Sequence, residues 1–180
     1  YGDDVVFGPS DRYGGLRGNE GNDTFTTQFG GYVDYRNDEG AVVANLSSAM
    51  LYFEGPYFSA SLDSGQIRDG WGYFDTSQGV DGFVGSEYSD VIFMAETSPS
   101  DYAWAEGMYG SDILVGSANK PGDDNEIWQV ARYKGLSESE WSAGDGIYVN
   151  FNDARLLSTL TTTPDYDLLQ GVIGVVGDVN

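Results

Sequence analysis

Residues 18–25 read GNEGNDTF, and this short stretch decides the fold prediction. It places glycines at Gly18 and Gly21, an aspartate at Asp23 and a large apolar residue at Phe25. These are four of the fixed positions of the nonapeptide GGxGxDxUx, in which U is a large apolar residue. Glycine permits the positive φ of a tight turn, the carboxylate enters the turn, and the apolar side chain points inside. The stretch therefore predicts a turn followed by a short β-strand.

Two later stretches repeat this pattern. Residues 107–114 read GMYGSDIL and match at the same four positions, with Gly110 as the second glycine and Asp112 as the aspartate. Residues 85–92 read GSEYSDVI and keep the first glycine, Asp90 and the apolar anchor, but a tyrosine replaces the second glycine. Repetition of one turn-and-strand unit predicts stacked coils that share a core.

Two further stretches are partial copies. Residues 2–6 read GDDVV and form the C-terminal half of the pattern around Asp4. Residues 122–127 read GDDNEI and place Asp124 at the aspartate position, with the apolar residue one place late. The chain thus begins inside a motif, which suggests a mature or excised fragment of a longer protein.

The spacing of the aspartates predicts which turns stack. Asp4 and Asp23 are 19 residues apart, close to two nonapeptides and hence to one full coil. Asp90 and Asp112 are 22 residues apart and can stack in the same way if residues 97–104 bulge out. Each pair is therefore expected on one edge of the structure.

The turns offer oxygen atoms, which favour calcium. Ca²⁺ prefers roughly six to eight oxygen ligands, so one turn supplies only part of a site and a stacked turn must complete it. For each aspartate the alternative is an Asx turn, in which the carboxylate caps its own loop. The predicted metal ligands, by carboxylate or turn carbonyl, are Asp4, Gly21, Asp23, Asp90, Gly110, Asp112 and Asp124.

The composition agrees with a cation-binding module. The chain carries 29 acidic and 8 basic residues, a net charge of −21, and bound divalent cations are the simplest way to offset the repulsion. With no basic patch, nucleic acid and anionic lipid are excluded as partners. The absence of Cys and His excludes thiol catalysis, zinc-thiolate sites and most transition-metal sites. No stretch resembles a membrane span or a signal peptide, so no membrane insertion is expected.

An internal repeat divides the chain into two units. Residues 75–85 (DTSQGVDGFVG) recur as residues 167–177 (DLLQGVIGVVG), with seven of eleven positions identical. A looser pair precedes them, since Val33-Asp34-Tyr35 resembles Ala131-Arg132-Tyr133 and Asn45-Leu46 resembles Asn150-Phe151. We expect one unit at residues 1–82 and a second at residues 83–180, joined in one continuous module.

Glycine punctuation and short β-prone triplets predict an all-β chain, since no stretch sustains helical periodicity. Two long aromatic-rich insertions, at about residues 47–74 and 136–165, are expected to form antiparallel hairpins. The fold prediction is therefore a right-handed parallel β-roll or β-helix with inserted antiparallel hairpins.

The turns at 2–25, 85–93 and 107–127 resemble the repeats-in-toxin (RTX), or haemolysin-type calcium-binding, family of secreted bacterial proteins. The repeated Gln-Gly-Val phrases are also similar to the strand-bearing linkers between RTX blocks of long secreted adhesins. The resemblance implies a parallel β-roll, Ca²⁺ in the turns, and folding on export into millimolar calcium. Most of the Gly-Gly pairs of that family are broken here, which leaves the number of sites open.

These observations favour a non-enzymatic, calcium-stabilised structural or adhesive module of a secreted, extracellular or cell-surface protein. One alternative is a carbohydrate-binding accessory domain of a secreted polysaccharide-active enzyme, with polysaccharide as partner. Another is a subunit of a surface layer or filament, whose partner is a second copy of the chain. Paired carboxylates are plentiful, but sequence cannot place two across a sugar as glycosidases require.

The aromatic residues of the insertions either stack on sugars or cover the open face and ends of a small core. They are Tyr52, Phe53, Tyr57, Phe58, Trp71, Tyr73, Phe74, Trp128, Trp141 and Tyr148. Tyr102 and Trp104 lie in an acidic loop that is expected to bulge out, and we expect them to be exposed contact residues. Trp128, in a strand-like run, is expected to be more buried than either.

Overall fold

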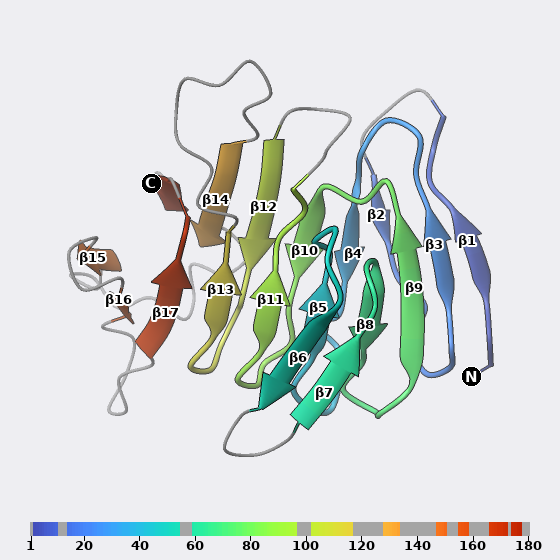
Figure 1. Cartoon of the computed structure of the whole chain (residues 1–180), viewed down its shortest axis with the longest axis horizontal. Helices are drawn as coiled ribbons and strands as arrows, with labels where there is room; N and C mark the ends of the chain where they lie inside the picture. Colours follow the sequence, from blue (N-terminus) through green and yellow to red (C-terminus); the bar gives the residue numbers. More distant parts are fainter. Residues whose placement is uncertain are drawn as a thin grey trace.

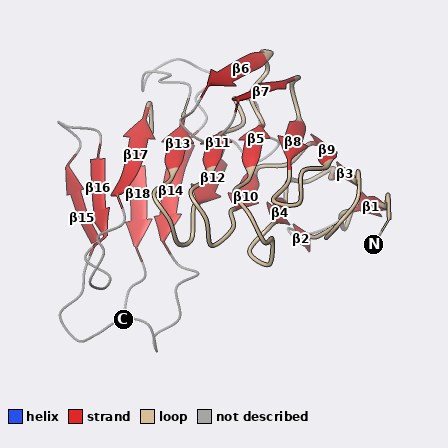
Figure 2. Cartoon of the chain, turned by 90° about the horizontal axis from the view of Figure 1, so that it is seen from below, coloured by secondary structure: helices blue, strands red, loops and turns tan. Residues whose placement is uncertain are grey.

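The computed structural model describes residues 2–10, 14–54, 59–96, 102–116, 128–133, 147–150, 155–158, 166–172 and 174–177. Within these ranges the chain is all-β, and no helix occurs. The described part of the chain accordingly contains no helix long and apolar enough to cross a membrane. Two main sheets face each other, and a small hairpin lies outside them (Figures 1 and 2).

The first main sheet has ten strands. Its order is β1 (Val5–Phe7), β3 (Thr24–Thr26), β9 (Phe74–Gln78), β8 (Gln66–Arg68), β5 (Val43–Asn45), β11 (Val91–Phe93), β13 (Ile113–Val115), β17 (Tyr166–Gln170), β16 (Arg155–Ser158) and β15 (Ile147–Asn150).

The second main sheet has six strands, in the order β18 (Gly174–Gly177), β14 (Trp128–Tyr133), β12 (Tyr102–Glu106), β10 (Gly82–Val84), β4 (Tyr32–Asp34) and β2 (Gly15–Leu16). The chain alternates between the two sheets, from β1 to β2 to β3 to β4 to β5 and again from β9 to β14. All the pairings within the six-stranded sheet are parallel.

The two insertions supply the antiparallel pairings. In the first insertion, β6 (Leu51–Glu54) and β7 (Ser59–Leu62) form a hairpin, and β8 pairs antiparallel with both β5 and β9. In the second, β16 pairs antiparallel with both β15 and β17. These pairings confirm the fold prediction at the level of an all-β chain with mainly parallel sheets and antiparallel insertions.

The core lies between the sheets and is built from the central residue of each short strand. Because successive side chains of a strand point to opposite faces, a three-residue strand directs one side chain inward. Phe25, Ile92 and Leu114, the apolar anchors of the nonapeptide copies, are fully buried there. Phe83 from the opposite sheet stacks on Tyr35, with ring centroids 5.2 Å apart. The predicted inward direction of the apolar anchors is confirmed.

The internal repeat of the sequence reappears in the strand order. In the ten-stranded sheet, β1-β3-β9-β8-β5 is repeated as β11-β13-β17-β16-β15. In the six-stranded sheet, β2-β4-β10 is repeated as β12-β14-β18. We call β1 to β10 the first unit and β11 to β18 the second unit. The predicted boundary between residues 82 and 83 falls inside β10.

Candidate metal site: two rows of aspartates

Six aspartates occupy the same register at the start of strands in the ten-stranded sheet. We call Asp4, Asp23 and Asp75 the first row, and Asp90, Asp112 and Asp167 the second row. The strand registers align the three members of each row, because Val5 pairs with Thr24 and Thr24 with Thr76, while Val91 pairs with Ile113 and Ile113 with Leu168. Each unit therefore contributes one row.

Within the first row, the carboxylates of Asp23 and Asp75 each accept a hydrogen bond from the main chain of the aspartate before them. The N–H of Asp4 donates to Oδ1 of Asp23 at 2.8 Å, and the N–H of Asp23 donates to Oδ1 of Asp75 at 2.7 Å. Neighbouring strands lie about 4.8 Å apart, so the carboxylates follow one another at about one strand spacing.

The second row repeats these bonds. The N–H of Asp90 donates to Oδ1 of Asp112, and the N–H of Asp112 donates to Oδ1 of Asp167, both at 2.8 Å. Oδ1 of Asp90 in turn accepts the N–H of Val42 at 2.7 Å, which ties the row to β5 of the first unit. The predicted stacking of Asp4 with Asp23 and of Asp90 with Asp112 is confirmed. Of the bulge expected at 97–104, residues 97–101 lie outside the described residues, and residues 102–104 belong to strand β12 instead.

The first glycine of each nonapeptide copy makes room for the aspartate of the same turn. A Cβ on Gly18 would collide with Oδ2 of Asp23, and a Cβ on Gly107 would collide with Oδ2 of Asp112. Gly85 stands in the same relation to Asp90. The sequence predicted these first glycines from the backbone geometry of a turn. In the structure they are required because the aspartate carboxylate of the same turn approaches their Cα too closely for a side chain.

The second glycine is required for the positive φ that was predicted. Gly21 has φ 143° and Gly110 has φ 105°, a backbone region that side chains rarely adopt. Gly21 also packs against the carbonyl of Gly2, and Gly110 against the carbonyl of Tyr88, so the turns stack one on the next. Carbonyl and carboxylate oxygens are thereby gathered along one edge of the sheet.

Burial disfavours the charged form of several row carboxylates. Desolvation raises the pKa of Asp75 to about 7, against the hydrogen bonds from Tyr35 and Asp23, which lower it. Desolvation likewise raises the pKa of Asp90 to about 7, and the charge of Asp167 adds to the effect. The pKa of Asp23 is raised by burial, with smaller contributions from Asp4 and Asp3. Stacked, buried carboxylates of one sign form an environment that a cation would stabilise.

A second group of buried acids, Asp38 and Asp69, lies beside the first row, and sequence reasoning did not find it. The hydroxyl of Tyr35 donates to Oδ2 of Asp75 at 2.6 Å, and Oδ2 of Asp38 accepts the N–H of Gly70 at 2.9 Å. Burial, followed by the charges of Asp69 and Asp75, raises the pKa of Asp38 to about 7. When ionised, Asp38 and Asp69 add negative charge next to the first row.

Asp23 provides the clearest test of whether the rows fit a metal ion. Its side chain is buried, and Oδ2 has no hydrogen-bond donor among the described residues. A buried carboxylate oxygen without a donor is costly, and a hard cation is a chemically suitable partner for it. No group of three or more His, Cys, Asp or Glu side chains converges at metal-binding distance in the described ranges. A cation in the rows would therefore need backbone carbonyls to complete its ligands, as the stacked turns of Gly2 and Gly21 offer.

The structure thus brings Asp4 together with Asp23 and Asp90 together with Asp112, in two separate rows, and leaves one predicted carboxylate unplaced. Asp124 lies outside the described residues. Asp75 and Asp167 were missed as row members because no nonapeptide surrounds them. Both are the first residue of the repeated Gln-Gly-Val phrase, and this shared position is the signal that could have identified them.

The exposure predicted for Trp104 is wrong. Trp104 lies in the centre of β12 and is only 4% exposed. Its ring contacts Tyr32 at a centroid distance of 5.4 Å, and the guanidinium of Arg132 lies 3.9 Å over it. The indole also covers Gly82 on the neighbouring strand, where any side chain would collide with it. Tyr102 is half-buried, and the side chain of Trp128 lies outside the described residues, so the predicted contrast with Trp128 is not testable.

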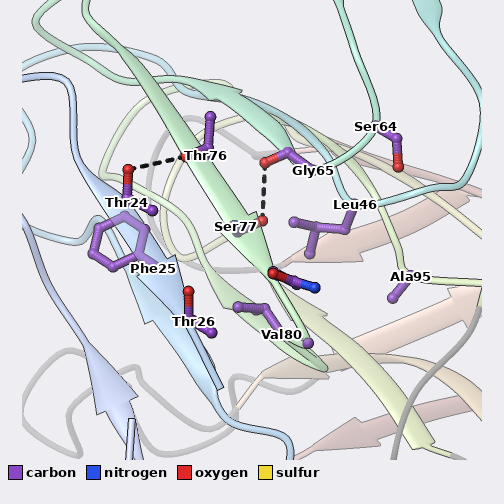
Figure 3. Close-up of a pocket in the computed structure, with 12 residues that line it drawn as sticks. Thr24, Phe25, Thr26, Leu46, Ser64, Gly65, Thr76, Ser77, Val80 and Ala95 are labelled. Atoms are coloured by element: carbon purple, nitrogen blue, oxygen red, sulfur yellow. Dashed lines mark hydrogen bonds between the residues drawn. The ribbon is translucent and has the colours of Figure 1, made fainter. Parts of the chain in front are cut away.

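A cavity of about 770 Å³ lies beside β3 and β9, and its lining is uncharged (Figure 3). Hydroxyl groups dominate its polar surface. Thr76 Oγ1 donates to Thr24 Oγ1 at 3.2 Å, and Ser77 Oγ donates to the carbonyl of Gly65 at 3.0 Å. Since no acidic or basic side chain lines this cavity, its lining supplies no carboxylate ligand for a metal ion.

A smaller cavity of about 370 Å³ has a different character. Trp71 lines it together with four polar residues, Asn19, Glu20, Asn37 and Glu39. One aromatic ring surrounded by amides and carboxylates is a lining that can stack on a ring while accepting and donating hydrogen bonds.

In comparisons with family models, curated proteins and solved structures, the chain has no match.

Proposed function

We propose that this chain is a calcium-binding structural or adhesive module of a secreted bacterial protein, related to the RTX repeats. Its scaffold is a right-handed parallel β-roll, in which each passage from one sheet to the other forms half a coil. The aspartate rows hold Ca²⁺ between stacked turns. The nonapeptide copies, the net charge of −21 and the in-register carboxylates support the proposal together.

The observation that carries the proposal is the environment of Asp23. Its Oδ1 accepts a hydrogen bond from the N–H of Asp4, whereas its Oδ2 is buried and has no hydrogen-bond donor in the described part of the chain. An Asx turn would satisfy the carboxylate within its own loop. The bond to Asp4 instead crosses between turns 19 residues apart, which is the arrangement that a cation shared by two turns requires.

Calcium would act on folding rather than on catalysis. The two rows exist only when strands distant in sequence lie side by side, so the binding free energy of the metal becomes folding free energy. Low calcium in the cytoplasm would leave the rows charged and repelling, and millimolar calcium outside the cell would stabilise the fold. The module has no enzymatic role in this proposal.

The test is calcium titration of protein stripped with chelator, followed by isothermal calorimetry and by thermal melting. We expect saturable binding and a melting temperature that rises with calcium, by an amount set by the ratio of calcium concentration to Kd. Magnesium should substitute poorly, because it demands a smaller octahedral cage. Absence of binding heat at millimolar calcium, with an unchanged melting temperature, would refute the metal site.

The cavity at Trp71 favours carbohydrate binding as a second function. Its ring and the polar side chains of Asn19, Asn37 and Glu39 would contact a sugar through stacking and hydrogen bonds. Trp71→Ala should abolish retention on a polysaccharide column while leaving the melting temperature within a few degrees of the parent protein. Retention that survives this substitution would place any glycan contact elsewhere.

A further inference from the structure

Asp69 keeps one buried carboxylate oxygen without a hydrogen-bond partner. Its side chain is fully buried, at 0% exposure. Oδ1 accepts the N–H of Trp71 at 3.1 Å and the N–H of Tyr73 at 2.6 Å, both in the loop that follows β8. Oδ2 has no hydrogen-bond partner among the residues that the structure describes. A buried carboxylate oxygen of this kind destabilises the fold unless a ligand binds it.

Asp38 brings a second buried carboxylate to the same place. Its Oδ2 accepts the N–H of Gly70, the residue after Asp69, at 2.9 Å. Burial is the main cause of the raised pKa of Asp38, and among the neighbouring charges that of Asp69 contributes most, ahead of Asp75 and Asp90. The two carboxylates therefore lie near each other. Because Oδ1 of Asp69 is directed at the N–H groups of its own loop, Oδ2 is the oxygen available to the space shared with Asp38.

The backbones of the two loops that carry these acids are in contact. Strand β8 lies between β9 and β5, so the loop after β8, residues 69–73, meets the loop before β5, residues 37–40 (Figure 1). A Cβ on Gly40 would collide with the carbonyl of Gly70, and a Cβ on Gly70 would collide with the carbonyl of Gly40 and with Cβ of Asp38. Main-chain carbonyls thus lie beside the two carboxylates. Carboxylate and carbonyl oxygens are the ligands that Ca²⁺ prefers.

The same two loops line the cavity of about 370 Å³. Asn37 and Glu39 are exposed on either side of the buried Asp38, and both line the cavity. Trp71, two residues after the buried Asp69, lines it from the other loop. Each loop therefore directs a carboxylate to the interior and presents other side chains to the cavity. A ligand held between the two carboxylates would fix the lining of the cavity.

We propose that a calcium ion binds between loops 37–40 and 69–73, with Asp38 and Asp69 as its carboxylate ligands, and that this ion fixes the cavity at Trp71. The ion offsets two like charges that burial holds close together. In the described ranges no group of three acidic, His or Cys side chains converges as a metal site. Main-chain carbonyls and water therefore complete the coordination, as they do in many Ca²⁺ sites.

This site differs from the aspartate rows in its ligands and in its effect. The rows join strands of one sheet in register, whereas this site joins two loops that also line a cavity. The cation site rests on neither function proposed above. Its effect on a bound sugar rests on the second proposed function, because it assumes that the cavity at Trp71 holds a glycan.

Calorimetric titration of calcium into chelator-stripped protein tests the site, with Asp69→Asn as the variant. Asparagine has the same shape and keeps an oxygen for the N–H groups of Trp71 and Tyr73, but it carries no charge. We expect the variant to bind one calcium ion fewer per chain than the parent protein. Asp63→Asn removes the same charge from an exposed loop position and should leave the stoichiometry unchanged. Equal stoichiometry in the parent protein and Asp69→Asn would overturn the proposal.

The fluorescence of Trp71 reports on the loop without any change at Asp69. Calcium should alter the emission of the parent protein by a component that is absent from Trp71→Phe, because the ion holds the loop that carries the ring. Asp69→Asn should lose this component and Asp23→Asn should retain it, which separates the site from the first row. An emission change that is identical in the parent protein and Trp71→Phe would contradict the proposal.

Polysaccharide retention separates this proposal from the second proposed function. If calcium alters the emission of Trp71 through Asp69 but no polysaccharide is retained, the glycan function fails and the cation site stands. If retention needs Trp71 and persists in Asp69→Asn and in chelator, the glycan function stands and the link between the ion and the cavity is refuted.

Discussion

The N–H of Asp90 donates a 2.8 Å hydrogen bond to Oδ1 of Asp112, on the next strand of the ten-stranded sheet. The same bond joins Asp4 to Asp23 in the first unit. An aspartate at this point therefore marks the start of its own strand and binds the start of the neighbouring strand. Because a slip by one residue would break every bond of a row, the aspartates help to fix the register of the sheet.

Asp23→Asn separates the hydrogen-bonding role of this residue from metal binding. Asparagine retains an oxygen that can accept the N–H of Asp4, but it carries no charge and is a weaker calcium ligand. In chelator we expect a melting temperature equal to or above that of the parent protein, because a buried charge has been removed. In calcium we expect the stabilisation by the metal to shrink. Scanning calorimetry with and without chelator measures both.

The control for this substitution is Asp63→Asn, which removes the same charge from an exposed loop position. Asp23→Ala completes the set, since it deletes the acceptor and should cost about 1–3 kcal/mol in chelator as well. If Asp23→Asn and Asp63→Asn show the same response to calcium, Asp23 does not ligate the metal.

The metal-free protein should become less stable as pH rises from 4 to 8. Burial raises the pKa of Asp38, Asp75 and Asp90 to about 7, well above the unfolded value of about 3.9. Between these values the folded state binds more protons than the unfolded state, so the free energy of unfolding falls with rising pH. Urea denaturation in chelator at a series of pH values measures the slope.

Calcium should reverse this trend, because it binds the ionised carboxylates that high pH produces. The increase in the midpoint of unfolding on adding calcium is therefore expected to be larger at pH 8 than at pH 5. A metal-free protein whose stability climbs from pH 4 to pH 8 would contradict the burial of these three carboxylates.

Gly18→Ala should destabilise the protein through Asp23. The φ of Gly18 is not in the left-handed region, so the cost comes from collision of the new Cβ with Oδ2 of Asp23. Overpacking of this kind costs about 1–3 kcal/mol. In the double variant Gly18→Ala/Asp23→Ala the carboxylate is absent, and the two costs should not add. Strictly additive free energies of unfolding would mean that the collision is relieved in another way.

Several features could be predicted from the sequence because they are local. The nonapeptide copies identified the turns, the buried anchors Phe25, Ile92 and Leu114, and the stacking of Asp4 on Asp23. The repeated Gln-Gly-Val phrase predicted an internal repeat, and its two copies lie at equivalent places in the strand order. In each case the signal lies within one or two coils, where spacing along the chain determines spacing in the sheet.

The remaining features depend on contacts that are distant in the sequence. Strand β3 pairs with β9, which begins about fifty residues later, because β5 is displaced along the sheet and leaves room for β8 and β9. No local sequence pattern predicts this displacement of β5. Trp104 was expected in an exposed loop because acidic residues flank it, yet the space over Gly82 and the cation of Arg132 hold its ring in the sheet. The acids Asp38 and Asp69 carry no motif, and only the fold buries them.

Tyr35→Phe should weaken the first row, and more so at high pH. The Tyr35 hydroxyl donates to Oδ2 of Asp75 at 2.6 Å, and this bond lowers the pKa of Asp75 against the larger effect of burial. Phenylalanine keeps the ring that stacks on Phe83 but leaves the buried oxygen without this donor. The expected loss is about 1–3 kcal/mol when Asp75 is ionised and less when it is protonated.

The pH profile of this loss distinguishes the hydrogen bond from simple repacking. Without the Tyr35 donor the folded pKa of Asp75 rises further, so the difference in unfolding free energy between parent and variant should grow as pH passes from 5 to 8. Tyr52→Phe, at an exposed position on the hairpin, is the matched control and should show no loss at either pH. A loss at Tyr35 that is constant across this range would mean that the hydroxyl packs in the core without binding the Asp75 carboxylate.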